Sequence, residues 1–88
     1  MPVKLLGKDT LEFSGPLGQA YIRYSESLDA FAVDTFGTEP DTDEAYIDSE
    51  SFPSATQACE YALACTGVVL MSLHALVNQC LTLEKVPA

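Results

Sequence analysis

Hydrophobic and polar residues alternate in short runs over residues 1–50, and turn residues separate the runs. Alternation with a period of two places one side of a strand against a core and leaves the other side polar. Gly, Pro and Asp between the runs favour tight turns, because Pro restricts φ and Gly accepts positive φ. This half therefore predicts an antiparallel meander of four to five short strands, at residues 3–6, 10–14, 19–25, 30–36 and 44–48.

After residue 53 the hydrophobic residues recur in steps of three and four, which is the spacing of one face of a helix. Ser54 is the predicted N-cap because Gln57 stands three residues on, as in a capping box. Ser51 is the competing cap, with Pro53 then in the first turn. The apolar stripe runs through Ala58, Ala62, Cys65, Val69, Leu73, Leu76, Cys80 and Leu83.

Gly67 lies in the middle of this stripe, and Gly is a poor helix former. We expect one long amphipathic C-terminal helix, kinked at Gly67 and packed on the sheet. Two helices separated at Gly67 are the alternative. Strands followed by a helix predict fold class α+β, in a single domain that spans residues 1–88.

The apolar segment is long enough to cross a bilayer, but its composition argues against a membrane span. Residues 62–83 contain Ser72, His74 and Asn78, and no Lys or Arg flanks them on the N-terminal side. The first residues lack the long apolar core of a secretory signal. We therefore expect no membrane contact and a cytoplasmic location.

Three cysteines, all in the C-terminal third, agree with that location. A small secreted domain stapled by disulfides usually has an even number of them. The spacing of Cys59, Cys65 and Cys80 does not match the spacing of zinc ligands. We expect free thiols in the core, no metal site and no cofactor.

The charge of the chain is strongly unbalanced, with 13 Asp and Glu against 4 Lys and Arg and a formal net charge of −9. Ten of the thirteen acidic residues lie between Glu26 and Glu60, and no Lys or Arg occurs from Tyr24 to Glu84. If strands 30–36 and 44–48 are neighbours, these acids gather on the sheet and the loop beside it. We call the set that is predicted to bind a partner the acidic patch: Asp34, Glu39, Asp41, Asp43, Glu44, Asp48 and Glu50.

We find no pattern of catalytic residues and predict that the chain is not an enzyme. The single histidine, His74, has no carboxylate or cysteine three or four residues away to orient it. Asp41 does not begin an EF-hand loop, because Tyr46 stands at the Gly position and Phe52 at the final Glu position. The 4 basic residues are too few to follow a phosphate backbone, so direct binding of nucleic acid is not expected.

The clustered carboxylates indicate a basic partner, because the Lys and Arg that bind phosphates also bind carboxylates. We expect a small non-enzymatic protein-interaction domain. In its sharpest form it is an inhibitor that binds a basic, nucleic-acid-binding surface of a partner protein by charge mimicry. Anti-restriction and anti-CRISPR proteins act in this way, and the analogy is physical because no motif carries it.

Two alternatives stay open. One is a homo-oligomeric structural or regulatory domain whose acidity serves solubility. The other is a ligand- or metal-binding subunit with a site at a dimer interface. The apolar arc of the predicted helix is wider than a small sheet covers, and Leu63, Leu70 and Val77 on its flank are the predicted homodimer interface.

Overall fold

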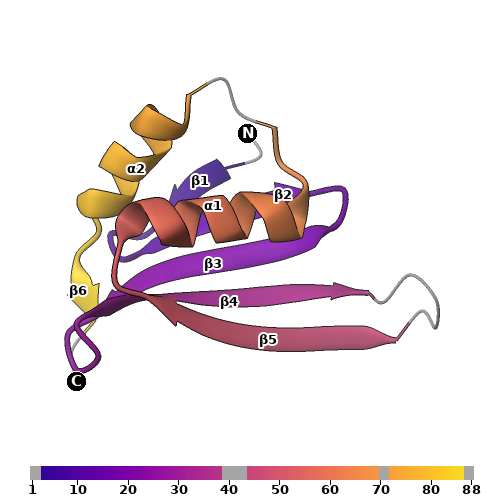
Figure 1. Cartoon of the computed structure of the whole chain (residues 1–88), viewed down its shortest axis with the longest axis horizontal. Helices are drawn as coiled ribbons and strands as arrows, with labels where there is room; N and C mark the ends of the chain where they lie inside the picture. The colour runs from indigo at the N-terminus through magenta and orange to yellow at the C-terminus, as the bar shows by residue number, and fades with distance from the viewer. Residues whose placement is uncertain (1–2, 39–43, 70–71, 87–88) are drawn as a thin grey trace.

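The structure is a computed structural model that describes residues 3–38, 44–69 and 72–86. Strands and helices follow one another in these segments as Figure 1 shows. The strands are β1 (Val3–Leu6), β2 (Thr10–Gly15), β3 (Gly18–Ser25), β4 (Ala30–Thr38), β5 (Ala45–Phe52) and β6 (Lys85–Val86). The helices are α1 (Ala55–Thr66) and α2 (Leu73–Leu81). The predicted α+β class is confirmed.

The first five strands form an antiparallel sheet in chain order, which confirms the meander. Short connections favour this order, because only antiparallel neighbours can be joined by tight turns. β5 is longer than the predicted strand 44–48, since it pairs with β4 over its whole length, from Ala45 opposite Thr38 to Phe52 opposite Phe31.

The short strand β6 was not predicted. It pairs in parallel with the end of β3, where Lys85 lies opposite Tyr24. β2 stops pairing with β3 at Ile22, so this edge of β3 is open to another strand. A two-residue strand has too little pattern to be seen in a sequence.

The prediction of one long helix is wrong, because Gly67 ends α1 and does not kink it. Gly67 has a φ of 72°, a left-handed conformation that Gly adopts readily, and its N–H donates to the carbonyl of Leu63. Ser72 then caps α2, and its hydroxyl accepts a hydrogen bond from the Ala75 N–H at 3.2 Å. Ser54 caps α1 as predicted, accepting from the Gln57 N–H at 3.4 Å.

The hydrophobic core lies between α1 and one face of the sheet. Leu11, Phe13, Ile22 and Val33 of the sheet are fully buried there. α1 faces them with small residues, Ala58, Cys59 and Ala62, which let the helix approach the sheet closely. The stripe predicted from the sequence fails at the helix break, where Val69 is 91% exposed.

α1 crosses the middle of the sheet, while α2 packs beside α1 and not across the sheet (Figure 1). The opposite face of the sheet, which we call the outer face, is not covered by either helix. Within the described segments, no helix has the length and apolar character needed to cross a membrane.

Candidate functional site

β5 forms one edge of the sheet and carries two residues of the predicted acidic patch on the side that faces α1. Asp48 lies directly opposite Thr35 of β4. Glu50 lies opposite Val33 in the same way. Residues directly opposite each other share a face, and Val33 and Thr35 are both buried on the core side. Asp48 and Glu50, which we call the β5 carboxylates, are nevertheless exposed, because α1 lies nearer the middle of the sheet (Figure 1).

Asp34 lies on the outer face, although β4 and β5 are neighbours as the acidic-patch hypothesis required. Its carboxylate accepts a hydrogen bond from Arg23 at 3.2 Å and another from the Ser49 hydroxyl at 2.6 Å. The guanidinium of Arg23 compensates the charge of Asp34. Strand alternation therefore separates Asp34 from the β5 carboxylates, and a flat partner cannot contact both groups at once.

The other members of the acidic patch lie near the start of β5 or before it. Glu44 directly precedes β5 and is exposed. Glu39, Asp41 and Asp43 lie outside the described residues. The β5 carboxylates are therefore the part of the acidic patch whose surroundings can be analysed.

Tyr61 and Cys65 lie one helical turn apart on the side of α1 that is turned toward β5. The ring of Tyr61 packs against Phe52 of β5, with 5.0 Å between the ring centroids. Burial, a hydrogen bond with Cys65, and the negative charges of Asp48 and Glu50 together raise the pKa of Tyr61 to about 12. The contact between Phe52 and Tyr61 thus joins the edge strand to this side of α1.

Asp48 also accepts a hydrogen bond from the backbone of its own strand, β5. The N–H of Ser49 donates to Oδ1 of Asp48 at 3.1 Å. The hydroxyl of Thr35 donates to the carbonyl of Asp48 at 3.4 Å, so this carbonyl is on the β4 side. In an antiparallel ladder the residues of one strand point their backbone groups alternately toward each neighbour. Ser49 therefore directs its N–H away from β4, toward the open edge.

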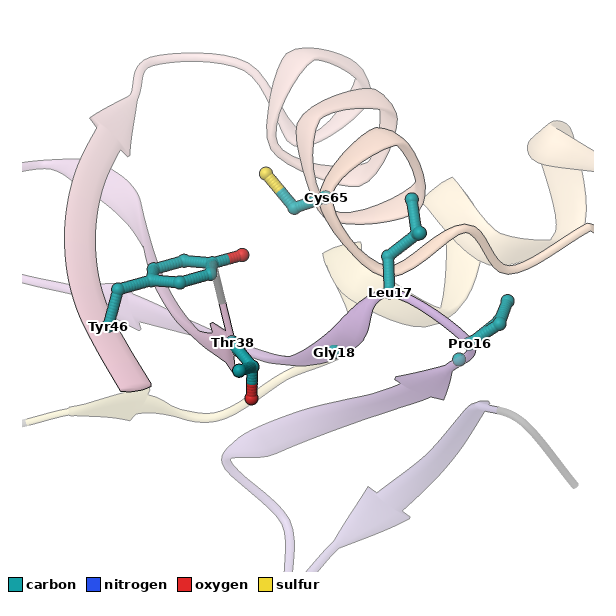
Figure 2. A pocket seen from close by; sticks show the side chains of 8 residues that line it. Pro16, Leu17, Gly18, Thr38, Tyr46 and Cys65 are labelled. Carbon is teal, nitrogen blue, oxygen red and sulfur yellow. The ribbon is translucent and has the colours of Figure 1, made fainter. Parts of the chain in front are cut away.

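An open pocket of about 630 Å³ lies beside this surface (Figure 2). It lies between the β2–β3 turn, the end of β4, the start of β5 and the last turn of α1. The residues that line it are Gly15, Pro16, Leu17, Gly18, Gly37, Thr38, Tyr46 and Cys65. Among these described lining residues there is no carboxylate, Lys, Arg or His, and Tyr46 and Cys65 are the two with ionisable side chains.

Sequence reasoning missed this pocket, because four segments that are distant in the chain contribute to it. The signal that was present is a row of glycines, since Gly15 pairs with Gly18 and Gly18 pairs with Gly37 on adjacent strands. A Cβ on Gly37 would lie 2.7 Å from the ring and hydroxyl of Tyr46. Glycine at this position is what allows Tyr46 to lie over the end of β4.

The predicted dimer-interface residues have a role inside the chain. Leu63 and Val77 are half-buried and pack against the hydrophobic core. Leu70 lies outside the described residues. An interface between copies would therefore reach only the part of Leu63 and Val77 that the core leaves exposed.

Cys59 and Cys80 are buried where α1 meets α2, and both are free thiols. A hydrogen bond with Cys59 and burial raise the pKa of Cys80. His74 is exposed on α2. Over residues 3–38, 44–69 and 72–86, no group of three His, Cys, Asp or Glu side chains is arranged to hold a metal ion.

The chain shows no significant similarity to a protein-family model, to a curated protein or to a solved structure.

Proposed function

We propose that this chain is a small acidic, non-enzymatic protein-interaction domain that binds a basic, nucleic-acid-binding surface of a partner protein by charge mimicry. The observation that carries the proposal is the position of the β5 carboxylates. Both are exposed, and both lie on one side of an edge strand.

The two ion pairs found among the described residues lie on the outer face of the sheet. Lys4 pairs with Glu12 at 3.5 Å on the outer face, and Arg23 pairs with Asp34 at 3.2 Å on the same face. These are two of the 4 basic residues of the chain. An acidity that served only solubility would not require two carboxylates to lie together on one side of an edge strand, because net charge alone provides solubility.

The spacing of the β5 carboxylates suits a surface that normally binds phosphates. Residues two apart on a strand are about 7 Å apart along it. Consecutive phosphates of one DNA strand are about 3.4 Å apart along the helix axis and are also displaced around it, so their separation in space is about twice that rise and comparable to the spacing of the two β5 carboxylates. Lys and Arg form charge-assisted hydrogen bonds with both kinds of oxyanion.

The test is capture of partners from a cell lysate at low and at high salt, followed by a competition assay. The captured protein is mixed with labelled DNA or RNA, and the chain is added. We expect the chain to displace the nucleic acid, and the displacement to weaken as salt screens the contact. The variant D48N/E50Q is expected to lose this activity.

The matched control is E26Q/E84Q, which removes the same charge from two exposed positions outside β5. It should retain displacement. Equal loss in both variants would mean that only net charge matters, and a captured protein that does not bind nucleic acid would contradict mimicry.

The second candidate is a homo-oligomer, and the outer face favours it. Tyr21 and Phe36 pack edge to face there, with 5.5 Å between the ring centroids. Ile47 beside Phe36 is 75% exposed. Light scattering over a range of protein concentrations tests this candidate, and I47K should dissociate an assembly formed through the outer face.

A further inference from the structure

β5 combines the acidic surface with an unpaired strand edge. Within the described segments β5 pairs with β4 alone, over eight residues. Neither helix lies along the edge of β5 that points away from β4 (Figure 1). Exposed strand edges are templates for another strand, and natural proteins commonly protect them with charged residues. The β5 carboxylates are the charged groups on this edge.

The backbone groups that an added strand would need can be identified. The Ser49 N–H points to the open edge, where Asp48 accepts its hydrogen bond at 3.1 Å. By the alternation of an antiparallel ladder, Ile47 and Ser51 point their backbone groups the same way. An incoming strand with a basic residue could replace this hydrogen bond. Its backbone carbonyl would accept from the Ser49 N–H, and its cation would pair with the Asp48 carboxylate that is released.

A second copy of the chain fits this edge poorly. An antiparallel pair of β5 strands centred on Ser49 would put Asp48 of each copy directly opposite Glu50 of the other. Pairs centred on Asp48 or on Glu50 would put two identical carboxylates opposite each other. Like charges directly opposite on adjacent strands are destabilising, whereas opposite charges are favourable. In these three registers the edge is complementary to a basic strand and not to a second copy of itself.

Building on the proposed function, we propose that β5 binds its partner by strand addition: an extended basic segment of the partner pairs antiparallel with Ala45–Phe52. Lys or Arg at alternate positions of that segment lies opposite Asp48 and Glu50. These positions form non-hydrogen-bonded pairs with the added strand, in which side chains approach most closely. The residue between the two basic ones exchanges backbone hydrogen bonds with Ser49, as in other recognition by strand addition.

The experiment uses the synthetic peptide acetyl-Thr-Val-Lys-Val-Lys-Val-Thr-amide and two derivatives of equal charge. In one derivative the valine amides are N-methylated, and in the other the lysine amides are N-methylated. We expect the parent peptide and the N-methyl-lysine peptide to bind, because their valine N–H groups face Ser49 and its neighbours. Loss of at least two backbone hydrogen bonds should weaken the N-methyl-valine peptide at least about tenfold.

Hydrogen exchange followed by NMR supplies an independent readout. The amides of Ile47, Ser49 and Ser51 should exchange at least about tenfold more slowly when the parent peptide is bound. The amides of β1, at the other edge of the sheet, should not change. D48N/E50Q should lose parent-peptide binding at low salt, and E26Q/E84Q should keep it.

The outcomes distinguish strand addition from charge mimicry. Equal binding by both methylated peptides, or no binding by the parent peptide, would overturn strand addition, while charge mimicry would still be judged by the nucleic-acid competition assay. Loss with the N-methyl-lysine peptide alone would indicate a parallel strand and overturn the register proposed here. Failure of the competition assay with strand addition intact would overturn only the proposed function.

Discussion

Replacement of Gly67 by Ala tests whether α1 and α2 are separate helices. Gly67 holds a φ of 72°, and a left-handed backbone costs a residue with Cβ about 1–2 kcal/mol. The added Cβ would also lie 3.0 Å from Cγ of Leu17 and 3.2 Å from Cγ of Pro16, so the β2–β3 turn would have to shift. We therefore expect G67A to lower the free energy of unfolding by about 2 kcal/mol.

The sign of the effect is what makes the test decisive. In the middle of one continuous helix, the same substitution would stabilise the protein by about 1 kcal/mol, because Ala is the better helix former. Urea unfolding followed by circular dichroism measures the difference. Each kcal/mol also corresponds to a change in Tm of about 4–8 °C for a domain of this size.

Two further variants separate the backbone conformation from packing. G67N should lower the free energy of unfolding less than G67A does, because Asn tolerates the left-handed region. A64G, at an exposed position inside α1, should lower the free energy of unfolding by about 1 kcal/mol through helix propensity alone. A rise in stability for G67A would refute two helices capped at Gly67.

Three other outcomes are expected. S54A should cost about 0.5–1 kcal/mol in urea unfolding through loss of the α1 cap, whereas S51A, at the competing cap position, should change stability by less than about 0.5 kcal/mol. In an alkaline absorbance titration with Y61F as the reference, Tyr61 should ionise with a pKa of about 12, and neutralising both β5 carboxylates should lower that pKa only in part, because burial is the largest cause of the shift. Since this folded-state pKa lies above the ordinary value of 10.0, the contribution of Tyr61 to stability should be complete below pH 10 and disappear as the pH rises through about 12. Iodoacetamide should label the half-buried Cys65 in the folded protein and the two buried cysteines only after unfolding, as mass spectrometry of the peptides will report.

Local pattern was enough to predict the strands of the meander and the cap at Ser54, because both depend on residues close together in the chain. Alternation with a period of two specifies which residues can share a face, and short turns make sequence neighbours pair. The capping signal is equally local, since Ser54 and Gln57 are three residues apart.

The break between the helices depended on tertiary contacts. Steps of three and four continue through residues 58–83, so the spacing alone gave no reason to stop at Gly67. In the fold, the N–H of Leu17 donates to the carbonyl of Thr66 at 3.0 Å, and the β2–β3 turn occupies the space next to Gly67. This contact satisfies a carbonyl at the end of α1 that would otherwise lack a partner.

The sequence by itself determined that the acids are concentrated around β5 and that no basic residue stands among them. Only the tertiary structure decided which acids share a surface. Asp34 and Asp48 lie on adjacent strands, but the pleat directs them to opposite faces, where Asp34 pairs with Arg23 and Asp48 is exposed to solvent. Charge is a property of composition, whereas a binding surface requires a register, and the register of β5 is set by its pairing with β4 over the whole strand.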